Sequence, residues 1–339
     1  MKTKFGSCSA VARPLPSARC QPVQVVAVSL LATFKLMAQN QSAGAAAAGT
    51  PPGDLAMMPP PMLQAPKATK NEISVSGDVM FGQGTVTLPL GYSLKQSLGG
   101  SVPTPLQAFS VPRDSVYFGG TLSYSYGQAW YVDLSYSKGQ SSGSQSINTG
   151  FLGSLDSSFS IDDTWYQLYI KYTFPQLRGR RFSAYLRAGA SYVTADITDD
   201  AQSPAAGRYS QRDTTDEILG NVGFGLGYSL YTTGRWRFGV QFEGEGFYGT
   251  RSQQTLENLA ADAGLSFVSA NIDNSLYGGI ARATLRTEYR LGQSGLFKIF
   301  GEIGVEGWYT LIDYSGATSS SSDELLWGPY AKLGIRYAF

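Results

Sequence analysis

The sequence predicts an all-β fold: a transmembrane, antiparallel up-and-down β-barrel of about ten strands, preceded by a signal peptide and a disordered linker. Three observations support this prediction. Glycine (40), tyrosine (21) and phenylalanine (17) are abundant while charged residues make up only 15%, a composition rich in turn and strand formers. From residue 71 onward, apolar and polar residues alternate with a period of two. Aromatic residues recur along the apolar face at a spacing that suits a bilayer.

The first 70 residues differ from the rest of the chain. Residues 1–38 are predicted to be a signal peptide: a basic start precedes a short apolar run at 25–34 (VVAVSLLATF), and "LMA", ending at Ala38, fits a cleavage site. A disordered N-terminus is the alternative. Residues 39–70 are rich in Ala, Pro and Gly without periodicity, which predicts a disordered linker. The barrel is therefore predicted to occupy residues 71–339.

The alternation divides this region into ten candidate strands. They are predicted over 72–88, 115–126, 129–138, 159–174, 181–197, 215–231, 234–250, 275–291, 295–312 and 325–339. Short connections are expected at 127–128, 175–180, 232–234 and 292–295, and long ones near 89–114, 139–158, 198–214, 251–274 and 313–324. Short turns at one end and long loops at the other are typical of transmembrane barrels. Pro89 leaves counts of eight or twelve strands open, and the spacing of apolar residues in 255–264 predicts a short surface helix.

Aromatic residues bracket the apolar faces of the last four strands. The bracketing pairs, each twelve residues apart, are Trp236 and Tyr248, Tyr277 and Tyr289, Phe297 and Tyr309, and Trp327 and Phe339. Twelve residues span roughly 40 Å of strand, or about 28 Å of height at a tilt near 45°. This matches a hydrocarbon core with an aromatic girdle at each rim. A soluble sandwich or a lipocalin-like barrel would expose these aromatic residues to water.

The opposite faces of the same strands carry charges of both signs. The predicted lumen charge network is Arg235, Arg237, Glu243, Glu245, Arg282, Arg286, Glu288, Arg290, Lys298, Glu302, Glu306, Lys332 and Arg336. Because a barrel of ten strands is narrow, we expect these side chains to fill the lumen as cross-strand ion pairs. A narrow pathway for small solutes or ions, lined by the same charges, is the alternative.

The chain ends in "YAKLGIRYAF", with apolar residues at every second position. These residues are Ala331, Leu333, Ile335, Tyr337 and Phe339. Together with the amphipathic strands, they make residues 71–339 similar to Gram-negative outer-membrane β-barrel proteins, with no specific subfamily indicated. The resemblance implies a location in the outer membrane, contact with its lipids and lipopolysaccharide, and recognition of the last strand by the barrel-assembly machinery.

Several other functions are disfavoured. Similar small barrels include omptin proteases, lipid A deacylases, palmitoyl transferases and phospholipases, whose known active sites use a histidine; this chain has none, so we expect no enzyme. Cys8 and Cys20 precede the apolar run, and the acidic segment 196–200 matches no calcium loop, so neither a metal nor a cofactor is predicted. The net charge of +1, without a basic stripe, disfavours nucleic acid.

The predicted function is a structural or surface-interaction role. The long outer loops would make the contacts, around a narrow lumen filled with charge. A narrow porin-like channel is the alternative function. The sequence indicates no surface ligand.

Overall fold

The computed structural model describes residues 71–90, 107–127, 129–148, 154–174, 181–203, 207–259, 265–268, 272–292, 296–314 and 320–339. The predicted signal peptide and linker lie outside these residues. Within them, no helix is long and apolar enough to cross a membrane.

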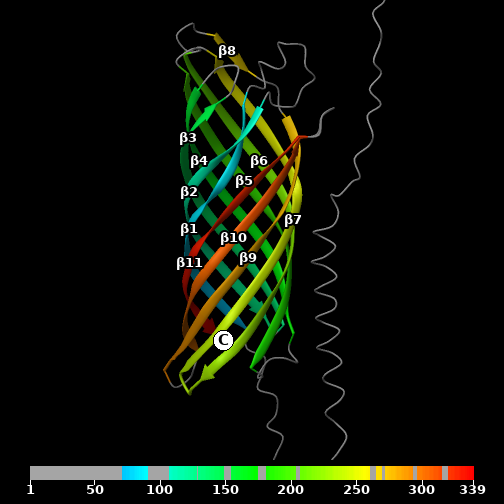
Figure 1. The fold of residues 1–339 in the computed structure, drawn as a ribbon. Helices are drawn as coiled ribbons and strands as arrows, with labels where there is room; N and C mark the ends of the chain where they lie inside the picture. The colour runs from blue at the N-terminus through cyan, green and yellow to red at the C-terminus, as the bar shows by residue number, and fades with distance from the viewer. Residues whose placement is uncertain are drawn as a thin grey trace, which may run out of the picture. The chain divides into compact units, whose positions relative to one another are not determined.

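Ten long antiparallel strands close into one barrel in the described part of the chain (Figure 1). They are β1 (Glu72–Leu90), β2 (Gln107–Tyr126), β3 (Trp130–Asn148), β4 (Ser154–Thr173), β5 (Phe182–Ser203), β6 (Gly207–Thr232), β7 (Trp236–Leu259), β9 (Ile272–Leu291), β10 (Phe297–Tyr314) and β11 (Ser320–Ala338). Each strand pairs with its neighbours along the chain, and β1 pairs with β11 to close the ring. A short strand, β8 (Leu265–Val268), pairs with β7 alone. The predicted fold class and the count of ten barrel strands are confirmed.

One end of the barrel carries the short connections and the C-terminus, and we call it the turn end; the opposite end is the loop end. Gly127 and Gly292 begin two of the short turns with φ values of 64° and 69°, a left-handed conformation that glycine adopts without a Cβ penalty. At the same end, the backbones of Asn71 and Phe339 exchange two hydrogen bonds of 3.0 and 2.9 Å. The closure between the first and last strands therefore extends to the last residue.

The strands continue further toward the loop end than predicted. Residues 139–148, expected to be loop, belong to β3, and residues 255–259, expected to begin a helix, belong to β7, which pairs there with β6 and β8. The helix prediction is wrong for these residues because ladder pairing with two neighbours outweighs the local spacing of leucines. The boundaries were missed because, beyond the lipid, strand exteriors face water and lose their apolar alternation.

The barrel exterior is apolar between two rings of exposed aromatic residues. The ring at the turn end contains Tyr124, Tyr126, Trp130, Tyr228, Tyr231, Trp236, Phe238, Phe297 and Phe339, and the ring toward the loop end contains Tyr136, Tyr166, Tyr192, Tyr248, Tyr277, Tyr309 and Trp327. Large aliphatic residues such as Val222 (68% exposed) and Leu333 (66% exposed) lie between them. A continuous apolar surface of this kind is a membrane-spanning surface.

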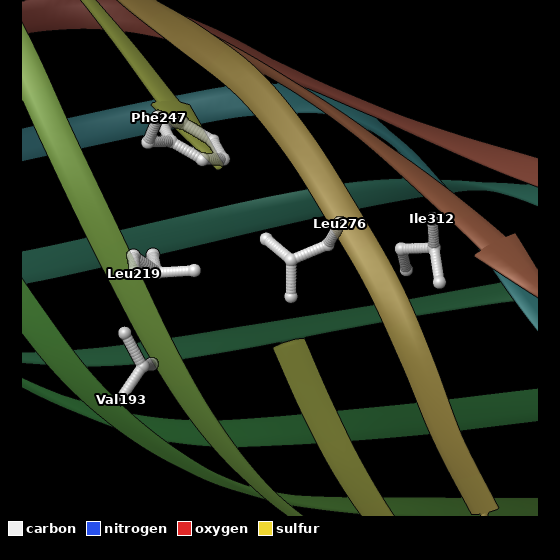
Figure 2. Packing of buried hydrophobic residues seen from close by; sticks show 5 residues of the cluster. All are labelled: Val193, Leu219, Phe247, Leu276 and Ile312. Carbon is white, nitrogen blue, oxygen red and sulfur yellow. The ribbon is translucent and has the colours of Figure 1, made fainter. Parts of the chain in front are cut away.

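The barrel interior contains apolar clusters as well as charges. One cluster joins Val193, Leu219, Phe247, Leu276 and Ile312 from five strands, as Figure 2 shows. A second contains Met80, Tyr117, Leu326 and Tyr330, and a third contains Val86, Leu88, Val111, Phe159 and Ile161. The expected lumen of charges is therefore interrupted by packed apolar layers.

Candidate functional site

A cavity of about 360 Å³, which we call the vestibule, lies in the turn-end half of the lumen. Its two sides differ in chemistry. Strands β1 to β3 line it with small hydroxyl residues such as Ser76, Thr121 and Ser135, whereas β7 to β11 line it with long charged residues such as Arg282 and Glu302. The vestibule remains open because the small side chains of one wall leave space that the long side chains of the other do not fill.

Two arginines hold the charges in the deeper part of the vestibule. Arg282 forms ion pairs with Glu306 and, at 3.1 Å, with Glu243. Arg187 lies 2.5 Å from Glu245 and 3.9 Å from Glu243, so that Glu243 joins the two arginines. All five side chains are at most 20% exposed. Ion pairing compensates the burial of these charges, because each charge alone would carry a desolvation cost of several kcal/mol.

Tyrosine hydroxyls complete the hydrogen bonding of these carboxylates. Tyr185 donates to Glu243, and Tyr169 donates to Glu245 at 2.7 Å. Asn221 in turn donates to the Tyr169 hydroxyl at 2.8 Å. The carboxylates are thus held by fixed donors from β4 and β5 as well as by arginines, which favours a rigid lumen.

A second group of charges lies nearer the turn end. Lys298 is 3.6 Å from both Glu72 and Glu288, and Arg336 is 3.8 and 3.7 Å from the same two residues. This square of alternating charges joins β1, β9, β10 and β11, so it ties the closing strand pair to its neighbours.

The remaining predicted lumen charges occupy different environments. Arg286 pairs with Glu302 at 3.4 Å. Lys332 lies opposite Asp78 on β1 and Glu302 on β10. Arg237 donates to the Ser229 hydroxyl at 2.7 Å. Among the described residues, Arg235, Arg237 and Arg290 make no ion pair within 4 Å, and Arg235 and Arg290 are exposed at the turn end.

Sequence reasoning missed several lumen residues. Glu72, Arg187, Tyr169 and Tyr185 are part of the networks described above, and Lys171 pairs with Asp133 at 3.0 Å. The period-two alternation of β1, β3, β4 and β5 indicated these residues, because all of them occupy the polar face of their strand. The pairing of Arg187 with residues far along the chain required the closed barrel.

Three aromatic rings end the vestibule. The ring of Trp308 lies 4.7 Å from that of Tyr117 and 5.2 Å from that of Trp165, and its indole N–H donates to Glu306. The same three residues also line a second cavity, of about 50 Å³, on their loop-end side. They form an aromatic partition between the two cavities.

A second partition lies beyond the first. Arg251 pairs with Glu217 at 2.6 Å and with Glu324 at 3.8 Å, and Glu324 also pairs with Arg113 at 3.6 Å. Ile197, Arg251 and Glu324 line both the second cavity and a third of only about 20 Å³. We call these three residues the ionic partition. The three cavities are thus separated by an aromatic layer and a charged one.

Two buried carboxyl groups lie in the part of the barrel beyond the loop-side aromatic ring. Asp199 accepts a 2.6 Å hydrogen bond from the Ser157 hydroxyl, and Asp213 accepts one of 2.8 Å from Gln211. Both are only 3% exposed. Burial raises the pKa of each carboxyl to about 6, because desolvation penalises the charged form. These groups titrate within the physiological range.

Most of the lumen acids described above have a polar partner. The partners are arginines, lysines, tyrosines, an amide for Asp213 and a serine hydroxyl for Asp199. Among the described residues, no group of three or more His, Cys, Asp or Glu side chains could hold a metal ion. The ion pairs in the turn-end half of the lumen join strands that are neighbours or next neighbours around the barrel.

Comparison with known proteins yields similarity of structure alone. No protein-family model and no curated protein matches the sequence. The outer membrane protease OmpT from Escherichia coli is similar with a TM-score of 0.47 and 11% identity, covering 80% of this chain and 97% of that one. The translocator domain of the autotransporter NalP from Neisseria meningitidis is similar with a TM-score of 0.41 and 12% identity, covering 78% of this chain and 88% of that one. The outer membrane protein OprG from Pseudomonas aeruginosa is similar with a TM-score of 0.31 and 12% identity, covering 80% of this chain and 96% of that one.

Proposed function

We propose that this barrel, which has the fold of an outer-membrane protein, is closed and serves as a rigid mount that presents its loop end outside the membrane. The observation that carries the proposal is the division of the lumen by the aromatic and ionic partitions. Separate cavities of about 360, 50 and 20 Å³ lie along the described lumen, and this separation supports the proposal.

The part of the barrel beyond the loop-side aromatic ring supports a surface role. On β7, eleven residues follow Tyr248, and the exterior residues Thr250, Ser252 and Gln254 are polar and exposed. Eleven residues extend about 36 Å along the strand. The buried Val86, Leu88 and Phe159 pack inside this region. A closed sheet with a polar exterior and a packed interior is a stable platform for loops.

The membrane arrangement can be tested by labelling. Cys8 and Cys20 fall within the predicted signal peptide, and the described barrel contains no cysteine. Ser252→Cys at the loop end and Thr233→Cys at the turn end therefore each place one thiol in the barrel. With a membrane-impermeant maleimide on intact cells, we expect Ser252→Cys to react and Thr233→Cys to react only after lysis. The reverse pattern would overturn the orientation, and recovery of the protein in a soluble fraction would overturn the membrane assignment.

The closed state can be tested in planar bilayers. We expect the purified wild-type protein to produce no reproducible single-channel steps, because no continuous path crosses the aromatic partition. Steps that change size in Arg286→Ala would refute the closed barrel, since Arg286 lines the vestibule.

A narrow channel is the second candidate function. It is favoured by the vestibule itself, which reaches from the turn end to a partition formed by one layer of three rings. A displacement of Trp308 would join the vestibule to the second cavity. The bilayer measurement separates the two functions.

Two partners follow from the resemblance and from the exterior. Outer-membrane lipids and lipopolysaccharide would contact the apolar band, and the barrel-assembly machinery would bind the last strand. In support of the second, Ala331, Leu333, Ile335, Tyr337 and Phe339 all face outward, and β11 carries no lumen-facing apolar residue after Tyr330 except Ala338.

A further inference from the structure

Two shallow hollows on the barrel exterior meet at Phe81 and Pro329, and together form one groove. The first, of about 610 Å³, crosses β7, β9, β10, β11 and β1, and its lining is almost entirely apolar. The second, of about 820 Å³, continues across β1, β2, β3 and β4 and mixes polar with apolar residues. Phe81 and Pro329 line both.

The strand register shows the direction of the apolar half. Phe242, Ala283, Val305 and Pro329 are successive cross-strand partners, and the gap in β1–β11 pairing opposite Pro329 places Phe81 next in the row. Four strand spacings give a length of about 19 Å. The groove exists because Ala283 and Ala331 are small between the larger residues that line it.

Along its length, the groove moves from the middle of the lipid-facing band toward the loop end. On β7 it starts at Phe242, midway between Trp236 and Tyr248, and on β11 it passes Pro329, two residues from Trp327 of the loop-side ring. On β4 it ends at Asp162, four residues beyond Tyr166. It therefore leads from the middle of the lipid-facing band to the polar surface beyond it.

The second hollow, which forms the half of the groove nearer the loop end, is acidic. Asp114 and Asp162 are exposed there, and Gln140 donates to Asp162 at 3.0 Å. Among the described residues that line it there is no lysine or arginine. A phosphate alone would meet two like charges at this site, whereas an ammonium group would meet acceptors of the opposite charge.

We propose that this groove binds one lipid molecule whose headgroup carries a primary ammonium group. The acyl chain lies along the row from Phe242 to Phe81, and the ammonium group lies over the acidic half of the groove, where Asp114 and Asp162 supply the negative charge. The proposal rests on the membrane placement proposed above. The groove is apolar within the lipid band, crosses the loop-side aromatic ring and becomes acidic beyond it. An amphiphile with an acyl chain and a cationic headgroup would match these surfaces in the same order.

Native mass spectrometry of the barrel from nanodiscs tests this proposal with defined lipids. We expect wild type to retain one phosphatidylethanolamine in preference to phosphatidylglycerol of the same chain length. Asp114→Asn with Asp162→Asn should lower that retention about threefold to fivefold, as expected for exposed charge pairs. Ala283→Phe should lower retention of both lipids because it fills the apolar half.

Matched controls exist on β5 and β6, the two barrel strands that do not line the groove. Asp216→Asn removes an exposed acid on β6, and Ala188→Phe adds a ring to the lipid-facing side of β5; both should retain lipid as wild type does. Equal retention of the two lipids by wild type, or unchanged retention in the double Asp variant, would overturn the proposal. A dimer that Ala283→Phe dissociates without loss of lipid would instead identify a second copy as the occupant. Failure to enter nanodiscs would contradict the membrane placement itself.

Discussion

The indole N–H of Trp308 donates a hydrogen bond to Glu306, and this bond connects the aromatic partition to the charges of the vestibule. Glu306 uses its other oxygen to bind Arg282, which also pairs with Glu243. The ring that we propose to block the lumen is therefore held by the same network that joins strands β7, β9 and β10. In that proposal, Glu306 couples closure to strand pairing.

Removing the aromatic partition should open the second cavity to water. Thr310 lines that cavity, so Thr310→Cys should react slowly with a small water-soluble thiol reagent in the wild-type background. With Trp165→Ala and Trp308→Ala added, we expect the reaction rate to rise at least about tenfold, because the two rings no longer separate the cavities.

The controls for this experiment use the same chain. Ser135→Cys lines the vestibule and should react at a similar rate in both backgrounds, whereas Trp327→Ala on the exterior should leave Thr310→Cys protected. Rapid reaction of Thr310→Cys in the wild-type background would show that the partition does not close the lumen.

Arg187→Ala should destabilise the barrel strongly. The substitution leaves Glu243 and Glu245 with one fewer cation in a buried site, and we expect a loss of about 3–5 kcal/mol in the free energy of unfolding. Denaturant unfolding followed by tryptophan fluorescence in detergent measures this quantity. The matched control is Arg208→Ala, because Arg208 is 63% exposed and lies 3.7 Å from Asp200; its effect should stay within about 0.5 kcal/mol. Equal effects of the two variants would contradict a structural role for the buried network.

The region beyond the loop-side ring should become less stable as the pH rises from 4 to 7. Asp199 and Asp213 have pKa values of about 6 in the folded barrel and an ordinary value of 3.8. Between these values the folded state binds more protons than the unfolded state, so the free energy of unfolding falls with rising pH, by up to about 3 kcal/mol for each group. Amide hydrogen exchange in β5 and β6, corrected for the intrinsic rate, measures the change.

The double variant Asp199→Asn with Asp213→Asn provides the control for pH. It removes both titrating groups and keeps amide oxygens that accept from Ser157 and Gln211. We expect protection in β5 and β6 to lose most of its pH dependence. A pH dependence as large as that of wild type would assign the effect to other groups.

Phe339→Ala should reduce assembly more than it reduces stability. The substitution keeps both backbone hydrogen bonds between Asn71 and Phe339, and the ring is 54% exposed, so we expect a loss of no more than about 1 kcal/mol in assembled barrels. The yield of folded protein in vivo, read from the heat-modifiable gel shift, should fall severalfold. Trp236→Ala, in the same ring of aromatic residues, is the control and should not reduce assembly to the same extent. Equal yields from wild type and Phe339→Ala would argue against recognition of the last residue.

The sequence predicted the faces of the strands better than their ends. Trp236, Tyr248, Tyr277 and Trp327 lie on the exterior, and Glu243, Glu302 and Glu306 face the lumen, because side chains alternate between the two faces of a strand. The ends of β3 and β7 could not be predicted, because a strand that leaves the lipid no longer has an apolar exterior. The helix expected at 255–264 was wrong over residues 255–259, because pairing of β7 with β6 and β8 outweighs the local spacing of leucines.

The sequence by itself determined the closed antiparallel barrel, its apolar and polar faces and its aromatic last strand, because these depend on local alternation and short turns. Only the tertiary structure decided which charges meet. Arg187 pairs with Glu243 and Glu245 from more than fifty residues away, and Tyr117, Trp165 and Trp308 come together from β2, β4 and β10. The physical reason is that contacts across a lumen depend on ring closure and strand stagger, which no local pattern in the sequence records.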